Sequence, residues 1–174
     1  SAAPAARAET QRRRQAVAAA RVQPTGVPPH FKQSHTKTHP QHGKVPAEIA
    51  RSLKDSLELM GFVGWFDVDN LKVISKDALA RGVSECATMI VLLNDETADS
   101  EWCRFEWETA AALKIPIKVV VDLERGNKQE LLKRCLADFP ALTSHQWLEY
   151  IERYPRDCMM ETCALLPPPA GGAG

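Results

Sequence analysis

Apolar and polar positions follow two different periods along the middle of the chain. The segment PAEIARSLKDSLELMG, residues 46–61, has apolar side chains at the spacing of one helix face. The run ATMIVLL, residues 87–93, is continuously apolar, which is typical of a strand buried on both faces. IPIKVVVD, residues 115–122, is also mainly apolar and is expected to form a second buried strand. Strands that alternate with helices in this way predict a parallel sheet covered by helices on both faces.

The remaining patterns extend this order in both directions. HFKQS, residues 30–34, is expected to form the first strand, and FVGWFD, residues 62–67, the second. Ser100 is a suitable N-cap for a helix that continues to residue 114. Further helices are expected at 75–85, after the capping pair Asn127 and Glu130, after the pair Thr143 and Gln146, and through Met159 to Leu166. The plan is an α/β fold that is flavodoxin-like in its order of elements.

Two extensions flank the predicted domain, which comprises residues 30–154. Residues 1–29 are expected to form a basic arm, rich in Ala and Arg, that ends in a Pro-rich linker. Residues 5–22 contain good helix formers but almost no apolar stripe, so their helix would be marginal on its own. Residues 155–174 combine an amphipathic segment with a Pro/Gly tail.

Charge is unevenly distributed although the formal net charge is zero. Residues 1–44 hold eight Lys or Arg and one acid, a net charge of +7, and the remainder carries −7. This pattern indicates that the basic stretch 1–44 contacts something anionic: an acidic partner, nucleic acid, a membrane surface or the acidic body of the chain itself. The alternative is a solvated flexible tail. Arg12–Arg14 lack aromatic stacking partners, so binding to nucleic acid would be unspecific and strongly salt-dependent.

Cysteine usage bears on the compartment. The five cysteines form no CxxC pair and are odd in number, which argues against a disulfide framework. We expect an intracellular reducing compartment: the cytoplasm, or an organelle if residues 1–23 follow or contain a transit peptide. No apolar run approaches the roughly 20 residues of a transmembrane helix.

Three common phosphate-binding or catalytic motifs do not occur in the sequence. There is no GxxxxGK[ST] or GxGxxG phosphate-binding loop and no GxSxG nucleophile elbow. Four of the five histidines cluster between residues 30 and 42, but Pro40 interrupts the helical spacing that would bring two of them together. We expect solvated loop histidines, no metal site and no required cofactor.

The stretch SEWCRFEWETA, residues 100–110, mixes tryptophans and carboxylates most densely. Trp102, Glu106 and Ala110 are four residues apart and so share one face of the predicted helix. One interpretation places Trp102 and Phe105 in the core and makes Glu106 a rim carboxylate with a backbone or lysine partner. The other holds Glu106 beside the Trp102 indole because a ligand binds there.

These residues resemble the TIR (Toll/interleukin-1 receptor) domain family. SEWCRFEWETAAALKIPIKVVVD is similar to the family's Ser-x-Trp-Cys-x-x-Glu helix and the strand after it, and GVSECATMIVLLN to the helix and strand before it. LKDSLELMGFVGWFDVDNL is similar to the first helix and second strand, and HFKQSHTKTH to the opening strand and loop. The resemblance covers about residues 30–154 and implies a flavodoxin-like parallel sheet of about five strands with helices on both faces.

The resemblance implies one of two functions. Many family members are homotypic interaction modules in signalling, which implies a protein-interaction or scaffold domain that associates with partners or with itself in a larger assembly. Others cleave the nicotinamide–ribose bond of NAD⁺ with a glutamate on this helix, which implies the alternative of an NAD⁺ glycohydrolase with NAD⁺ as substrate. Glu106 would then be the essential carboxylate, since a carboxylate stabilises the oxocarbenium character that develops on the ribose.

The resemblance also implies a set of nucleotide contacts. Residues 69–77, DNLKVISKD, match the family's BB loop, between the second strand and the second helix. The implied NAD⁺ contacts are Trp102, Ser34, His35, Lys72 and Ile74. Ile74 stands where NAD⁺-cleaving members often have glycine, and SHTKTH lacks the arginine or aromatic residue that often follows their first strand. Both differences favour the interaction module.

Overall fold

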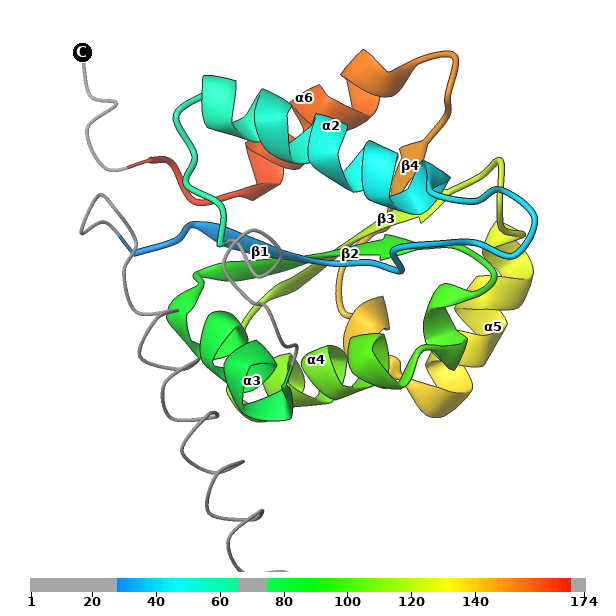
Figure 1. The fold of residues 1–174 in the computed structure, drawn as a ribbon, viewed down its shortest axis with the longest axis horizontal. Helices are drawn as coiled ribbons and strands as arrows, with labels where there is room; N and C mark the ends of the chain where they lie inside the picture. Colours follow the sequence, from blue (N-terminus) through cyan, green and yellow to red (C-terminus); the bar gives the residue numbers. More distant parts are fainter. Residues whose placement is uncertain (1–27, 66–74, 170–174) are drawn as a thin grey trace, which may run out of the picture.

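A parallel sheet of four strands forms the centre of the computed structural model, which describes residues 28–65 and 75–169 (Figure 1). The strands lie in the order β1 (Phe31–Ser34), β2 (Thr88–Leu93), β3 (Ile117–Asp122) and β4 (Leu148–Tyr150). Every residue of β2 is buried, as expected for an apolar strand covered on both faces. The predicted α/β fold with a parallel sheet is therefore confirmed.

Helices cover both faces of the sheet (Figure 1). α2 (Val45–Leu59) and α6 (Pro155–Leu165) lie on one face, and α3 (Lys76–Glu85), α4 (Glu101–Ala112) and α5 (Lys128–Asp138) lie on the other. Short 3₁₀ turns, η1 (Thr97–Asp99) and η2 (Pro140–Thr143), precede α4 and β4. Each face has its own hydrophobic cluster, one that includes Trp107 and one that includes Phe31.

The C-terminal helix α6 packs into the second of these clusters. Cys158 and Leu166 are buried there together with Leu53 and Leu57 of α2. Residues 155–166 therefore share one core with the sheet. No helix among residues 28–65 and 75–169 is long and apolar enough to cross a membrane.

The predicted second strand makes only one bridge within the described residues. Gly64 pairs in parallel with Phe31, and a Cβ atom on Gly64 would lie 2.8 Å from the Phe31 ring, so glycine permits this close approach. The remainder of the predicted strand and most of the BB loop, residues 66–74, lie outside the described residues.

The predicted helix after Thr143 and Gln146 is wrong, because residues 148–150 form the edge strand β4. Trp147 packs into the cluster on the α4 face, whereas Leu148 and Tyr150 pack against the cluster on the α2 face. That alternation has the period of a strand. Pairing with β3 outweighs the local capping pattern, and the next helix begins only at Pro155.

Candidate functional site

α4 is the helix that carries the TIR-like glutamate. It begins after Ser100, whose Oγ accepts a hydrogen bond from the Cys103 amide at 3.3 Å, as predicted for an N-cap. The side chains that α4 buries recur at helical spacing: Cys103, Glu106, Trp107 and Ala110. The helix therefore presents a carboxylate to the interior among apolar neighbours.

The carboxylate of Glu106 is paired inside the protein with a lysine from the first strand. Lys32 Nζ lies 3.1 Å from Glu106 Oε2, and the two side chains are 1% and 7% exposed. Lys32 is directed to this side because it shares a face of β1 with Ser34, opposite to Phe31, which lies in the other cluster. An ion pair this deeply buried depends on both charges, because either one alone would be very unfavourable away from water.

A tryptophan completes the surroundings of the lysine. The Lys32 ammonium lies 4.9 Å from the centroid of the Trp65 ring, within the range of a cation–π interaction. Trp65 in turn packs against Gly82 of α3, where an added Cβ would lie 2.7 Å from the indole. Gly82 weakens α3 as an isolated helix, but its missing side chain makes room for Trp65.

Ser34, a predicted nucleotide contact, is used inside the fold. Its Oγ accepts a hydrogen bond from Trp107 Nε1 at 3.1 Å, and Ser34 is fully buried. The Trp107 ring also makes an edge-on contact with Phe139, at a centroid distance of 5.3 Å. α4 is therefore attached to β1 through two neighbouring residues, Glu106 and Trp107.

The structure does not place Trp102 in the core, as the first reading of the helix required. Trp102 is 44% exposed, whereas Trp107 is 2% exposed. Each step of four residues rotates the side chain by about 40° around a helix axis, and Trp102 lies that much beyond Glu106 on the side away from Cys103, Trp107 and Ala110, so it reaches the surface. The buried aromatic neighbour of Glu106 on α4 is thus Trp107.

Comparison with known proteins decides the family. The model of the TIR domain family matches residues 42–154, well over half of the chain. The chain belongs to the TIR domain family. The resemblance read from the sequence is therefore confirmed. No curated protein matches the chain.

The fold agrees with that of a solved TIR structure. The chain is similar to the TIR domains in a structure described as the activated Roq1 resistosome directly recognizing the pathogen effector XopQ. The two share 14% sequence identity with a TM-score of 0.55, and the alignment covers 77% of this chain and 96% of that chain. Likeness at this level of identity shows the shared fold alone.

The other implied nucleotide contacts of this TIR domain are only partly described. Lys72 and Ile74 lie outside the described residues. His35 follows β1 directly and is half-buried. Sequence reasoning missed Lys32, Trp65 and Trp107, although the alternation of the strand at 30–34 already placed Lys32 on the same face as Ser34.

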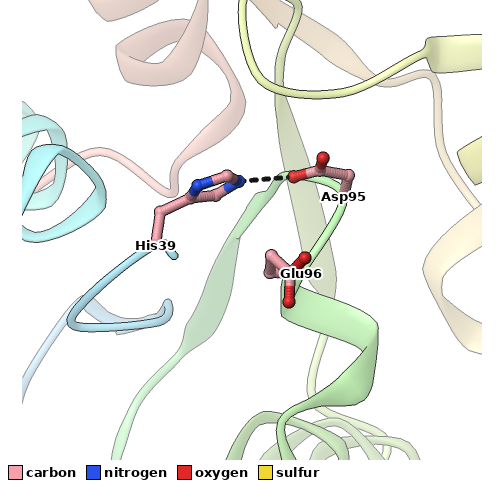
Figure 2. A group of neighbouring side chains, drawn as sticks. All are labelled: His39, Asp95 and Glu96. Atoms are coloured by element: carbon pink, nitrogen blue, oxygen red, sulfur yellow. Dashed lines mark hydrogen bonds and ion pairs between the residues drawn. The ribbon is translucent and has the colours of Figure 1, made fainter. Parts of the chain in front are cut away.

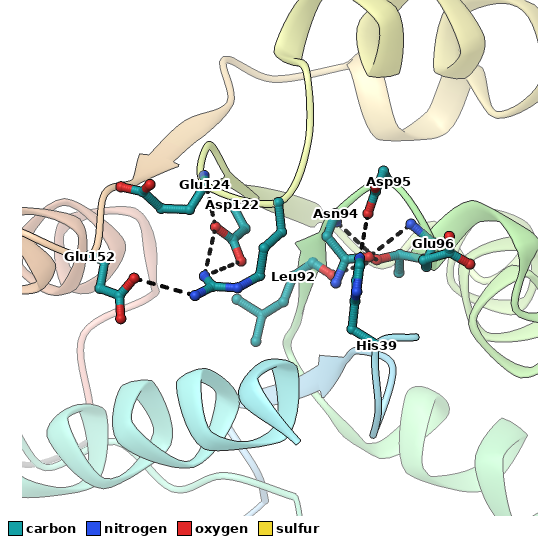
Figure 3. A network of polar contacts seen from close by, with 10 residues as sticks. His39, Leu92, Asn94, Asp95, Glu96, Asp122, Glu124 and Glu152 are labelled. Atoms are coloured by element: carbon teal, nitrogen blue, oxygen red, sulfur yellow. Dashed lines mark hydrogen bonds and ion pairs between the residues drawn. The ribbon is translucent and has the colours of Figure 1, made fainter. Parts of the chain in front are cut away.

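At the carboxyl edge of the sheet, polar contacts connect the loops of the TIR domain (Figure 3). His39 Nε2 lies 2.7 Å from Asp95 Oδ1, and the Asp95 amide donates to the Arg125 carbonyl at 2.9 Å. The Arg125 guanidinium then contacts Asp122 at 3.0 Å and Glu152 at 3.3 Å. These contacts connect the loops that follow all four strands, so the edge is held by side chains from distant parts of the sequence.

One group of three residues in the described part of the chain could hold a metal ion: His39, Asp95 and Glu96 (Figure 2). The hydrogen bonds of His39 oppose that use. Its Nδ1 accepts from the Gln41 amide at 3.1 Å, so Nε2 carries the proton that is donated to Asp95. A metal-bound histidine needs the opposite arrangement, with its second nitrogen donating. We therefore assign His39 and Asp95 to the attachment of the β1–α2 loop. The expectation that the histidines of this loop are solvated is wrong for His39, which is 3% exposed.

The thiol of Cys103, one turn before Glu106, has no nucleophilic role in this arrangement. Burial is the largest influence on it and raises its pKa to about 11. The thiol is therefore protonated at neutral pH, whereas a nucleophilic cysteine must be a thiolate. Cys103 is a residue of α4 whose side chain is buried in the hydrophobic cluster that also contains Trp107.

Proposed function

We propose that this TIR domain is a protein-interaction module of a larger assembly and that Glu106 stabilises its fold instead of cleaving NAD⁺. The observation that carries this proposal is the buried contact between Lys32 Nζ and Glu106 Oε2 at 3.1 Å. A carboxylate that stabilises a ribosyl oxocarbenium ion must face that ion without a competing cation. Lys32 supplies such a cation, and it would repel the developing positive charge.

The first test is the release of nicotinamide from NAD⁺. We expect wild type and Glu106→Gln to release nicotinamide at the same rate as a protein-free blank, at protein concentrations high enough for TIR domains to associate. Chromatographic quantification of nicotinamide measures this directly. Turnover by wild type that Glu106→Gln abolishes would reject the proposal.

NAD⁺ cleavage remains the second candidate because one observation favours it. Trp102 is 44% exposed, so its indole is accessible to a flat ring one turn before Glu106. In that case a bound nucleotide must separate Glu106 from Lys32 before the carboxylate can reach the ribose. Lys32→Met removes the competing cation, and nicotinamide release by this variant that exceeds wild type would favour the glycohydrolase.

The interaction surface that we propose lies along the free edge of β4 and the adjoining side of α6. A groove of about 640 Å³ there is lined by Trp147, Leu148, Ile151, Tyr154 and Leu165, together with charged side chains of both signs. Tyr154 is 56% exposed at its rim. Its occupant in our proposal is a second copy of the chain. Lys118, Lys128, Asp157 and Glu161 are all among its lining residues, and a surface that carries both signs of charge can complement itself.

The similar Roq1 TIR domains support association of this kind, because their structure is described as part of a resistosome. We expect Tyr154→Asp to weaken self-association of the whole chain by at least tenfold, since it replaces an aromatic ring that lines the groove with a charge. Sedimentation velocity over a concentration series measures the effect. The matched control is Leu136→Asp, at a leucine of α5 that is 58% exposed and lies outside the groove. A wild type that stays monomeric throughout, or equal weakening by the control, would reject this surface.

A further inference from the structure

A second, shallow hollow lies between α3 and α4. These two helices pack side by side on the face of the sheet opposite to α2 and α6 (Figure 1). The volume of the hollow is about 600 Å³. Short side chains such as Ala80 and Ala112 form part of its lining, and Leu113, which is 50% exposed, lies at one margin. A helix with small side chains can approach such a surface closely, and its burial would cover the exposed leucine.

The rim of this hollow is acidic at both ends of α3. Asp77 lies in the first turn of the helix and Glu85 in the last, and both are exposed. Arg81 lies between them on the same helix face, so these three residues carry a net charge of −1. The hollow therefore suits a helix that has cations about two turns apart and small side chains between them.

The basic arm enters the described structure beside this hollow. The Pro29 carbonyl accepts a hydrogen bond from the Ala87 amide at 3.2 Å, and Ala87 lies two residues beyond Glu85, the last residue of α3. Residues 23–27, between the Ala/Arg-rich segment and Pro28, can span about 17 Å when extended. Residues 5–22 are therefore connected to the body within reach of the end of α3 that carries Glu85.

We infer that the hollow between α3 and α4 binds residues 5–22 of the same chain as a helix. Charge spacing sets the register. Arg13 and Arg21 are eight positions apart, as are Asp77 and Glu85, and Arg21 is the closer of the two to the attachment point. A helix parallel to α3 then brings Arg21 to Glu85 and Arg13 to Asp77. The arm is the occupant because it is basic, rich in alanine and attached at the correct end.

Trypsin cleavage of the arm in the full chain tests this inference. Trypsin cuts after arginine, and a docked helix resists cleavage because it must first separate from the body. We expect Asp77→Asn with Glu85→Gln to accelerate cleavage after Arg12–Arg14 and Arg21 by about fivefold, and 0.5 M salt to accelerate it in wild type. Mass spectrometry of the shortened chain gives the rates. The matched control is Glu48→Gln with Asp55→Asn, which neutralises two exposed acids of α2 on the other face.

Each outcome decides the inference. Equal cleavage rates in wild type, variant and control would overturn it, as would protection that grows with protein concentration, because the arm would then dock on a second copy. Thermal melts establish that both double variants remain folded. Hydrogen exchange supplies a second measurement: amides of residues 5–22 should be protected in wild type and lose that protection in Arg13→Gln with Arg21→Gln. Unchanged protection in that variant would also overturn the assignment.

Discussion

Glu106→Ala is expected to lower the free energy of unfolding by about 3–5 kcal/mol, because it leaves the Lys32 ammonium buried without its carboxylate. Lys32 is only 1% exposed, so its charge cannot reach water without local rearrangement. Urea denaturation of the purified chain measures the effect as a shift of the midpoint at unchanged slope. Glu108→Ala is the matched control on the same helix: Glu108 is exposed, and we expect a change within about 0.5 kcal/mol.

A double variant distinguishes the effect of the two charges on stability from the effect of the volume that the two side chains fill. Lys32→Met with Glu106→Leu removes both charges and retains similar volumes, so we expect stability within about 1 kcal/mol of wild type, or above it. Each single change should be far more costly than the double change, which is the signature of a coupled pair. A loss below about 1 kcal/mol for Glu106→Ala would mean that the carboxylate is accessible to water. That result would strengthen the case for the glycohydrolase.

The fold could be predicted because its signals are local. The buried runs at 87–93 and 115–122 became β2 and β3, and the helical spacing at 46–61 became α2. β4 could not be predicted in the same way. It has only three residues, and its strand conformation depends on pairing with Val120, Val121 and Asp122. A contact with a distant strand is invisible to a local pattern of apolar positions.

The site was predicted less completely for the same reason. Spacing on the helix and the family resemblance selected Glu106, but they did not identify Lys32 as its partner, because a lysine in a short strand normally indicates exposure. The hydrogen bond from Trp107 to Ser34 joins residues 73 positions apart. Helical spacing alone does not show whether Trp102 or Trp107 is buried. Only the position of the sheet decides which indole is buried.

Trp107→Ala is the second change with a large expected effect, a loss of about 3–5 kcal/mol of unfolding free energy. Trp107 is 2% exposed, packs edge-on against Phe139 and donates to Ser34, so its removal leaves a cavity and takes away one hydrogen-bond donor of the buried Ser34 hydroxyl. Trp102→Ala on the same helix is expected to cost less than about 1 kcal/mol because its indole is 44% exposed. Urea denaturation of the two variants compares them under identical conditions.

Trp107→Phe isolates the polar part of this contribution. Phenylalanine retains most of the apolar contact but cannot donate to Ser34 Oγ, so we expect a loss of about 1–3 kcal/mol. Ser34→Ala in the same chain should recover part of that loss, since no hydroxyl then remains buried without its donor. If Trp102→Ala were instead as destabilising as Trp107→Ala, α4 would be rotated relative to the sheet. Glu106 would then no longer face Lys32, and the assignment of the carboxylate to the fold would fail with it.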